Sequence, residues 1–261
     1  MTSLDDDLLA LSDAQLLRYS RHILLEQFGV EAQLAFGRAR ALIVGVGGLG
    51  TPAALYLAAA GIGHLTIADP DRVDLTNLQR QILYSTHDVG SVKVQAAKRA
   101  LLDLNPEVKI EAIEQRLEGI PLDQLVGAAD VVLDCSDNFV TRHALNRACV
   151  AHGKPLVSGA AIRFDGQISV FDLRDDQAPC YHCLFPEGHD VEQVNCATMG
   201  VFAPLTGIIG AMQAAEALKC VVNLSGTLSG RLLLLDALSM QWHSIAITRD
   251  PQCDVCRERP V

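Results

Sequence analysis

The sequence predicts an α/β fold in which helices cover both faces of a doubly wound, mainly parallel sheet. Short apolar segments have the length and composition of buried strands, and amphipathic or alanine-rich segments of helical length lie between them. Such alternation with short connections is typical of a parallel sheet with crossover helices. The expected strands are 41–45, 64–69, 108–114, 130–135 and 155–159, and the expected helices are 51–60, 91–104 and 138–152.

The pattern changes after residue 165. Further strands are expected at 167–172, 231–236 and 241–248, with a helix of small residues at 204–222. No linker or change of composition separates this part from the first. We therefore expect its strands to extend the same sheet, in antiparallel order.

Composition and charge exclude several classes of protein. The chain has 261 residues, of which 49% are hydrophobic, so it can bury a sizeable core and is not disordered or fibrous. Its net charge of −10 argues against a nucleic-acid binder or a protein of anionic membranes. The first residues, MTSLDDD, carry acids where a secretory signal needs bases, which predicts a cytoplasmic protein.

Two long uncharged segments resemble membrane spans at first sight. Residues 41–63 contain six glycines and a proline, and residues 197–215 are interrupted by three glycines and a proline. These breaks fit a strand, a turn and a helix of a soluble core better than a continuous membrane helix. No membrane partner is expected.

The N-terminal region is expected to be helical. Ser12 and Gln15 have the spacing of a capping box, and Leu16, Leu17 and Ile23 begin an apolar pattern at helical intervals. The pattern continues to Phe28.

A glycine-rich turn follows the first expected strand. Gly45, Gly47 and Gly50 fit G-x-G-x-x-G, with a strand before and a helix after, and Gly48 adds a further glycine. Such a turn lets the backbone approach a phosphate at the N-terminus of the helix. Asp69 ends the next strand, where an acid accepts hydrogen bonds from a ribose. The turn predicts a Rossmann-like nucleotide site but does not separate NAD(P), FAD and ATP.

The segment after Asp69 favours a triphosphate. It holds acids, amides and bases close together, which suit a charged phosphate chain better than a neutral nicotinamide. These candidate nucleotide-binding residues are Asp71, Asn77, Gln79, Arg80 and Lys93.

Two interpretations remain open for Asp137 and Asn138, which follow the strand 130–135. A carboxylate at the C-terminal end of a parallel strand can hold Mg²⁺ beside phosphates. Asp and Asn are also preferred caps of a helix N-terminus. One side chain can serve each purpose.

Four of the eight cysteines form two C-x-x-C pairs, Cys180 with Cys183 and Cys253 with Cys256, separated by 69 residues. Two such pairs are typical of a closed four-cysteine zinc site, which is structural because no coordination position is left open. A redox C-x-x-C is the alternative, but it explains only one pair. We expect one structural Zn²⁺, which ties the C-terminal segment to the middle of the chain.

The other cysteines and most histidines are expected to be ordinary. Cys135, Cys149 and Cys220 lie in apolar elements and are predicted to be core residues. Cys196 follows a polar loop, where it is either a nucleophile or an incidental cysteine. Five histidines without ligand spacing are expected at the surface or at helix caps: His64, His87, His143, His152 and His243.

Together these segments resemble the MoeB/ThiF/HesA adenylyltransferases, bacterial relatives of ubiquitin-activating enzymes. The resemblance runs from about residue 16 to 256. It is carried by RYSRHILL, VGVGGLGTPAALYLAAAGIG, DPDRVDLTNLQRQ, VLDCSDN, SGAAIRFDGQISVF, PCYHC and CDVC. Residues 156–172 and PCYHC look closest to the molybdopterin-synthase adenylyltransferases (MoeB), whereas GTPAALYLA and the pair Gln241-Trp242 are similar to ThiF of thiamine synthesis.

The resemblance implies a reaction and a set of roles. ATP would adenylate the C-terminal glycine carboxylate of a small ubiquitin-like sulfur carrier protein, giving an acyl-adenylate and pyrophosphate ahead of thiocarboxylate formation. Gly48 and Asp69 would hold the nucleotide. The phosphates would be bound by Asn77, Arg80 and Lys93, and Asp137 would position Mg²⁺.

It also implies partners. In the family a second subunit contributes an arginine of the N-terminal helix, which here matches Arg21, so a homodimer is expected. Cys196 matches the cysteine that ThiF-type members link to their carrier, whereas MoeB-type members do not need it for adenylation. A separate sulfurtransferase is expected to supply the sulfur. One domain is expected, with N-terminal helices in 1–40, the nucleotide-binding core in 41–160, and a carrier-binding and zinc region in 161–261.

Two competing functions are weaker. An NAD(P)-dependent oxidoreductase fits the glycine turn and Asp69, but no acid–base pair for hydride transfer is evident. A zinc-stabilised scaffold that binds nucleotide without turnover leaves Arg21, Arg80, Lys93 and Asp137 without a purpose.

Overall fold

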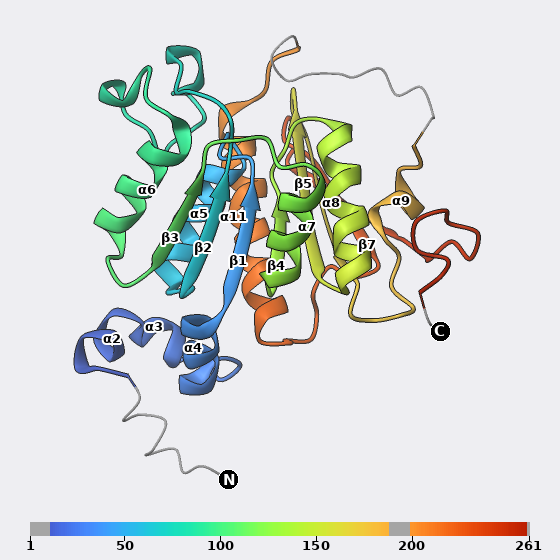
Figure 1. Ribbon diagram of the computed structural model, residues 1–261, viewed down its shortest axis with the longest axis horizontal. Helices are drawn as coiled ribbons and strands as arrows, with labels where there is room; N and C mark the ends of the chain where they lie inside the picture. Colours follow the sequence, from blue (N-terminus) through green and yellow to red (C-terminus); the bar gives the residue numbers. More distant parts are fainter. Residues whose placement is uncertain (1–10, 188–198, 260–261) are drawn as a thin grey trace.

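The computed structural model describes residues 11–187 and 199–259, and its core is one eight-stranded sheet in the order β3-β2-β1-β4-β5-β6-β7-β8 (Figure 1). The first five strands of that order are parallel, and the last three are antiparallel to their neighbours. The predicted α/β class and the antiparallel extension are therefore confirmed.

The elements follow the expected order along the chain. The strands are β1 (Arg40–Val44), β2 (His64–Ala68), β3 (Lys109–Ile113), β4 (Val131–Asp134), β5 (Pro155–Ile162), β6 (Asp165–Asp172), β7 (Arg231–Asp236) and β8 (Gln241–Ala246). The helices are α2 (Asp13–Arg18), α3 (Ser20–Ile23), α4 (Gly29–Arg38), α5 (Gly50–Ala60), α6 (Lys93–Leu104), α7 (Gly119–Ala128), α8 (Phe139–His152), α9 (Tyr181–Leu184) and α11 (Ala203–Val221), with 3-10 turns at Leu75–Asn77 and Thr86–Asp88.

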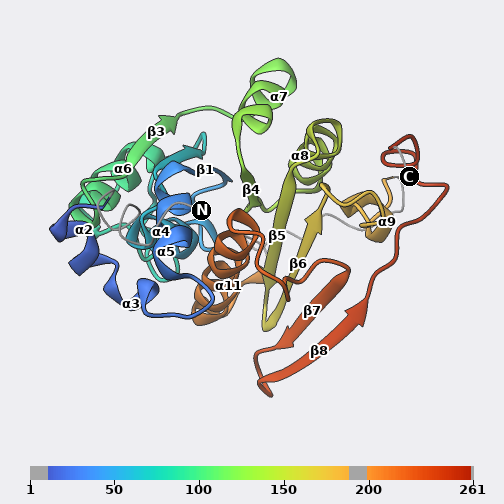
Figure 2. The same cartoon turned by 90° about the horizontal axis from the view of Figure 1, so that it is seen from below.

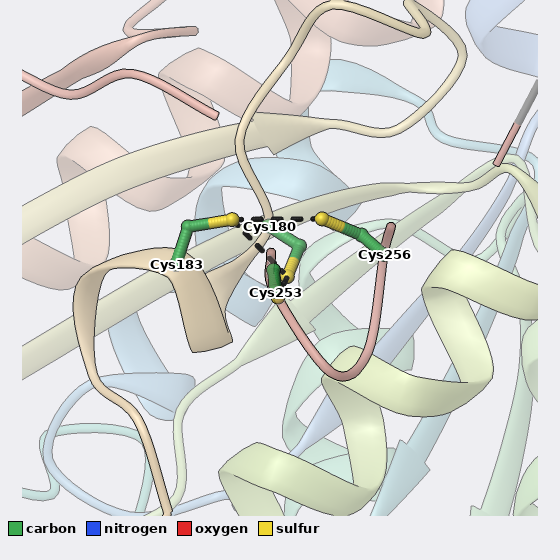
Figure 3. Close-up of side chains that lie close together, drawn as sticks. All are labelled: Cys180, Cys183, Cys253 and Cys256. Carbon is green, nitrogen blue, oxygen red and sulfur yellow. Dashed lines mark hydrogen bonds between the residues drawn. The ribbon is translucent and has the colours of Figure 1, made fainter. Parts of the chain in front are cut away.

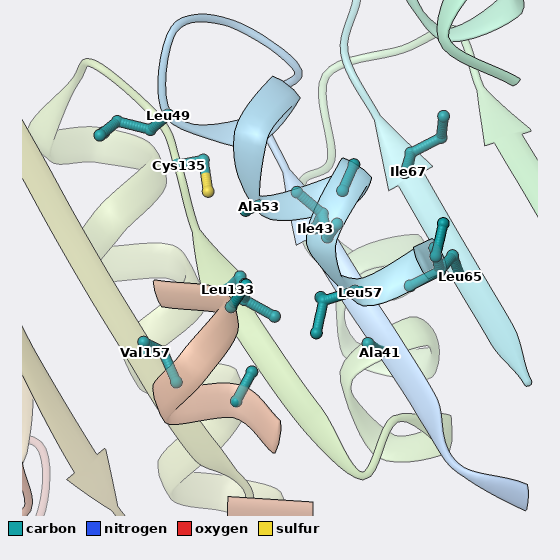
Figure 4. Close-up of a cluster of buried hydrophobic side chains, with 14 of the residues drawn as sticks. Ala41, Ile43, Leu49, Ala53, Leu57, Leu65, Ile67, Leu133, Cys135 and Val157 are labelled. Carbon is teal, nitrogen blue, oxygen red and sulfur yellow. The ribbon is translucent and has the colours of Figure 1, made fainter. Parts of the chain in front are cut away.

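Both faces of the sheet are covered, as its apolar strands require. Ile43 and its neighbour on the same face, Ala41, pack into one core with α5 and α11, whereas Leu42 and Val44 pack into a second core with α7 and α8. Figure 4 shows the first core between the strands and α5. Figure 2 shows α5, α6 and α11 on one side of the sheet and α7 and α8 on the other.

The ends of the helices follow local rules. Asn138 caps α8 by accepting the Thr141 N–H at 2.9 Å, and Gly153 ends the same helix with φ of 58°. Gly61 ends α5 in the same left-handed region, with φ of 85°. The strand order reverses between β1 and β4, so the carboxyl ends of these two strands are where this class of sheet binds ligands.

The N-terminal prediction is only partly confirmed. Ser12 and Gln15 form the capping box, but the helix stops at Arg18 and restarts at Ser20. Tyr19 between them turns inward, where its hydroxyl donates to Glu107 and accepts from Asn105. The tertiary contacts of this buried ring outweigh the helical periodicity.

Helix α7 was absent from the sequence prediction. Gly119 and Pro121 at its start are typical of turns, although proline is well tolerated in the first turn of a helix. Among the described residues, no helix combines the length and apolar composition that crossing a bilayer would require.

Candidate functional site

A cavity of about 670 Å³ opens at the carboxyl ends of the central strands. The glycine turn and the β4–α8 turn line one part of it, and strands β6, β7 and β8 line the other. Of the predicted nucleotide-binding residues, the structure brings Gly48, Arg80 and Asp137 together at this cavity. Its size and position make it the candidate active site.

The glycine turn needs its glycines for two different reasons. Gly45 has φ of 92°, and a Cβ there would lie 2.7 Å from the Cys135 carbonyl oxygen. A Cβ at Gly50 would lie 1.9 Å from the Gly45 carbonyl oxygen. At Gly47 the nearest heavy atom would be 3.6 Å away, on the Gln81 side chain. A Cβ at Gly48 would lie 3.1 Å from the Thr206 side chain. The outer glycines therefore make the turn possible, Gly48 allows close packing against Thr206, and Gly47 leaves the surface of the turn open.

Asp69 lies under this turn and is already bonded. One carboxylate oxygen accepts the Val46 N–H at 2.8 Å and the other accepts the Asp71 N–H at 2.9 Å. Burial raises the pKa of this carboxyl, and the nearby Lys93 charge and the two N–H donors partly oppose that shift. Asp69 does not line the cavity, and its predicted contact with a ribose stays a prediction.

Lys93 also lies outside the cavity lining. Its ammonium is 2.8 Å from a carboxylate oxygen of Asp71 and 3.9 Å from one of Asp69, and it is 5% exposed. Two acids thus compensate this buried charge. A phosphate that approached Lys93 would compete with Asp71 for it.

The segment 74–81 is a polar turn beside the cavity. Asp74 caps it by accepting from the Thr76 N–H and hydroxyl, and Arg80 donates to the Thr76 carbonyl and to Gln79. Arg80 lines the cavity, whereas Asn77 and Gln79 do not. The roles of these two amides stay predictions.

The β4–α8 turn shows the helix cap, whereas the magnesium role of Asp137 stays a prediction. Asn138 is the helix cap. Asp137 is exposed, lines the cavity, and makes no hydrogen bond or salt bridge to any residue within 11–187 or 199–259. Asp134 is fully buried, where it accepts from the Ser136 and Ser158 hydroxyls. Asp137 is therefore the carboxylate of this turn that is available to a cation.

Several lining residues were not among the predicted site residues. Arg142, one helical turn after Asn138 on α8, is 7% exposed and reaches the floor of the cavity. In the sequence, only its position four residues after Asn138, on the same helix face, could have indicated that Arg142 lies near this turn. Asp165, Asp236 and His243 line the part formed by the antiparallel strands, which only the strand pairing identifies.

The two C-x-x-C pairs form one cluster, as predicted (Figure 3). The sulfur–sulfur distances are 3.8 Å for Cys180 and Cys183, 3.7 Å for Cys180 and Cys253, and 3.5 Å for Cys183 and Cys256. A tetrahedron with Zn–S bonds of about 2.3 Å has sulfurs about 3.8 Å apart. The cluster therefore has the ligand set and spacing to hold a zinc ion.

Two nitrogen donors point to sulfurs of the cluster. The Asp250 N–H points to the Cys183 sulfur at 3.5 Å, and the Asn146 amide points to the Cys180 sulfur at 3.6 Å. The hydrogen bond from Cys180, together with the Asp250 N–H, lowers the pKa of Cys183 to about 4. Because all four sulfurs meet, the redox interpretation of a single pair explains less of the structure.

The remaining cysteine predictions divide. Cys135, Cys149 and Cys220 are buried, as expected, and burial raises the pKa of each thiol. Cys196 lies outside the described residues. The expectation for His143 was wrong, because this side chain is 6% exposed and packs against Tyr181 and His182 beside the cysteine cluster.

Arg21 lies at a different part of the molecule. It lines a cavity of about 390 Å³ with Tyr56 and Ala60 of α5 and Ala211 of α11. Gly50 begins α5 beside the candidate active site and Ala60 ends it, so about 15 Å of helix separates the two ends. Figure 1 shows α2 and α3 beyond the amino ends of the strands, opposite the candidate site.

Known proteins match the chain over nearly its whole length. The ThiF family model matches residues 19–255. The sulfur carrier protein ThiS adenylyltransferase of Escherichia coli is 46% identical over 94% of this chain and 97% of that protein. The molybdopterin-synthase adenylyltransferase of E. coli is 45% identical over 94% and 98%. The chain spans only 56% of the adenylyltransferase and sulfurtransferase MOCS3 of Drosophila persimilis, to which it is 46% identical over 96% of its own length.

Solved structures agree with these relatives. The crystal structure of E. coli MccB with ATP superimposes with a TM-score of 0.78 at 26% identity, over 92% of this chain and 73% of that one. The structure of MccB with MccA-N7isoASN gives a TM-score of 0.80 at 25% identity, over 94% and 75%. The sequence relatives are named adenylyltransferases. The residues that the family model matches include the glycine turn, the lining of the candidate cavity and three of the four clustered cysteines. This chain belongs to the ThiF family.

Proposed function

We propose that the chain is an adenylyltransferase that uses ATP to activate the C-terminal glycine carboxylate of a ubiquitin-like sulfur carrier protein. The observation that carries the proposal is the open cavity at the carboxyl ends of β1 and β4, which Gly48, Arg80 and the exposed Asp137 all line. The family and its relatives that act on sulfur carriers support the substrate class.

ATP lies with its phosphates against the open face of the glycine turn in this proposal. Gly45, Gly47, Gly48 and Gly50 shape the turn, and the free N–H groups at the start of α5 favour an anion there. Asp69 and Asp71 lie beside the ribose of ATP in this proposal. The phosphate-binding groups are Asn77, Gln79, Arg80 and Lys93. Lys93 exchanges part of its pairing with Asp71 for a phosphate oxygen.

Asp137 is proposed to hold Mg²⁺. Its carboxylate is exposed to the cavity without a hydrogen bond or salt bridge within the described ranges, and oxygen ligands of this kind suit a hard cation bound together with phosphates. When bound, the ion neutralises charge on the phosphates and on the departing pyrophosphate. Asn138 does not share this role because its side chain oxygen caps α8.

The reaction is an in-line substitution at the α-phosphorus. A carboxylate oxygen of the carrier forms the new bond, the bond from the α-phosphorus to the bridging β-phosphate oxygen breaks, and pyrophosphate leaves with both electrons of that bond. No general base is needed, because a C-terminal carboxylate is ionised at neutral pH. The chain therefore contributes position and charge, and Arg80 stabilises the charge that develops on the phosphate oxygens.

The active unit is proposed to be a homodimer. Arg21 is too far from the cavity of its own chain to reach ATP there, so the role that we predict for it requires a second copy. Large apolar side chains are exposed near Arg21: Leu17 (79% exposed) and Leu24 (73%) are close to it in the sequence, and Tyr56 (59%) lines the same cavity. Exposed apolar side chains beside an arginine are typical of an interface.

The carrier of molybdenum cofactor biosynthesis is the proposed partner. Residues 156–172 and the PCYHC loop carry that preference, and the thiamine carrier is the alternative that the ThiS adenylyltransferase relative supports. A separate sulfurtransferase then supplies the sulfur for the thiocarboxylate. Cys196 is dispensable for adenylation if the molybdopterin assignment holds.

Pyrophosphate exchange tests this proposal. Purified protein with ATP and Mg²⁺ is incubated with labelled pyrophosphate and either the molybdopterin-type or the thiamine-type carrier. Label is expected in ATP only when a carrier with an intact C-terminal glycine is present, and more with the molybdopterin-type carrier. Exchange with neither carrier would contradict adenylation, and exchange with the thiamine carrier alone would select the alternative.

Subunit mixing tests the role of Arg21. Arg21→Ala and Asp137→Ala proteins are each expected to be inactive. If each site takes Arg21 from one chain and Asp137 from the other, mixed dimers regain one intact site, about a quarter of all sites in an equal mixture. No recovery after verified subunit exchange would place both residues in the same functional unit and reject the shared site.

A further inference from the structure

Helix α8 connects the candidate active site to the cysteine cluster. Asn138 caps its first turn next to Asp137, and Asn146 lies eight residues further, about 12 Å along the helix axis. Arg142 lies between them at the same helical spacing. These three polar residues therefore follow one face of the helix from one site to the other.

The Asn146 side chain binds the segment that begins with Cys180. It is 0% exposed, its carbonyl oxygen accepts the Tyr181 N–H at 2.9 Å, and its amide points to the Cys180 sulfur at 3.6 Å. Both ends of this carboxamide thus fix the residues Cys180 and Tyr181. A buried side chain that makes these two bonds holds its helix at a defined distance from the cluster.

Arg142 is committed to the β4–α8 turn. One of its terminal nitrogens donates to the Ser136 carbonyl at 2.9 Å and to the Gly159 carbonyl at 3.4 Å. Its Nε lies 3.9 Å from an oxygen of the buried Asp134. Ser136 directly precedes Asp137, so this guanidinium fixes the turn that carries the exposed Asp137 carboxylate and joins it to the middle of β5.

Tyr181 packs against the same helix. This residue is 1% exposed and lies between Cys180 and Cys183 in the sequence. Its backbone N–H donates to Asn146, and its ring packs edge-on against His143, the neighbour of Arg142 on α8, with ring centroids 5.3 Å apart. The contacts therefore run from Cys180 and Tyr181 to Asn146, along α8 to Arg142, and from Arg142 to the turn at Asp137.

We propose that a metal ion in the cysteine cluster and ATP in the cavity stabilise each other's binding through α8, with Asn146 and Arg142 as positioning residues. The inference rests on the proposed nucleotide site. The ion ties Cys180 and Cys183 to the C-terminal pair, which holds Tyr181 against α8. Without that tie, Asn146 loses fixed partners and the turn at Asp137 loses part of its support.

The coupling acts in both directions. If the metal tightens ATP binding by a given factor, ATP must tighten metal binding by the same factor. We expect a factor of at least about five, the lower end of typical couplings. If the metal only tied down the C-terminal segment, it would leave the affinity for ATP unchanged.

Calorimetric titration of ATP measures the first direction without any carrier or turnover. Protein loaded with Zn²⁺ is compared with protein depleted by a chelator. The dissociation constant for ATP is expected to rise at least about fivefold on depletion. Competition with a chromophoric chelator then measures zinc affinity with and without ATP, which should change by the same factor. Equal ATP affinity in both states of folded protein would overturn the inference while leaving the proposed function intact.

Variants keep the test decisive if the depleted protein does not fold. Zinc-loaded Asn146→Ala is compared with Asn105→Ala, whose side chain is also 0% exposed but bonds to Tyr19 and Ala58, away from the 670 Å³ cavity and the cysteine cluster. Only Asn146→Ala is expected to weaken ATP binding, and Arg142→Lys is expected to weaken it while zinc content stays unchanged. Equal ATP affinity in the two asparagine variants would reject the coupling, and no ATP binding in the zinc-loaded wild type would reject the proposed function as well.

Discussion

The turn after β2 and the turn after β4 each follow a parallel strand and carry an aspartate, Asp69 and Asp137, but the surroundings of these two side chains are opposite. Asp69 is 6% exposed and accepts two backbone N–H groups beside Lys93. Asp137 is exposed in the cavity, without a hydrogen bond or salt bridge within residues 11–187 and 199–259. The difference teaches that the fold uses the Asp69 carboxylate to hold its own turn, whereas it leaves the Asp137 carboxylate exposed at the cavity.

The largest effect is expected at Asp137, in the turn after β4. Asp137→Ala should reduce carrier-dependent pyrophosphate exchange by about 100-fold or more, because charge stabilisation beside the reacting phosphate is lost. Its free energy of unfolding should change by no more than about 0.5 kcal/mol, since the side chain is exposed. Exchange assays and urea unfolding measure the two values. An active variant would remove Asp137 from the reaction.

The second effect is expected at the cysteine cluster, which contacts α8 at Asn146, further along the helix than the turn after β4. Cys253→Ser should lose its metal, measured by elemental analysis against about one zinc per wild-type chain, and lose about 3 kcal/mol of stability because a structural site contributes folding energy. Cys149→Ser is the matched control, because Cys149 is 0% exposed but outside the cluster. Equal metal content in both variants would contradict the assignment.

At the turn after β2, a substitution of Asp69 should lower the free energy of unfolding. Asp69→Ala leaves the Val46 and Asp71 N–H groups without their carboxylate, and each such loss costs about 1 to 3 kcal/mol. We expect an unfolding free energy lower by about 2 kcal/mol. If Asp69→Ala were as stable as Asp137→Ala, the contrast between the turns would fail.

The smallest effect is a pH dependence of the same carboxyl. Burial raises the pKa of Asp69 above its ordinary value of 3.8, so the folded protein holds this proton to a higher pH than the unfolded chain does. Its contribution to stability is therefore present below pH 3.8 and is lost as the pH rises through the raised pKa. Urea unfolding across the acid range should show the difference between wild type and Asp69→Ala shrinking as the pH rises. A growing difference would mean that the folded pKa is lowered.

Part of the site was predictable because it depends on local rules. The glycine turn needs small residues at fixed positions, and Gly45 and Gly50 occupy positions where a Cβ would overlap the backbone. The cysteine pairs carry their geometry in their spacing, and their four sulfurs meet as expected. The strand pattern likewise predicted the sheet, since buried strands must be apolar.

The rest depends on packing that no short segment encodes. The burial of Tyr19 interrupts the N-terminal helix through contacts with residues near 105. Arg142 lines the cavity and His143 is buried only because of where α8 packs. The pairing of Lys93 with Asp71 is equally invisible in sequence, since the residues are brought together by the fold.

Intact-mass spectrometry of the carrier tests the central claim most directly. The protein, ATP and Mg²⁺ are mixed with the carrier, and the reaction is quenched in acid to preserve an acyl-adenylate. The account predicts a carrier heavier by one AMP at its C-terminal glycine, with an equal amount of pyrophosphate released, and no such product with Asp137→Ala. An unmodified carrier, or release of ADP and phosphate in place of pyrophosphate, would contradict it.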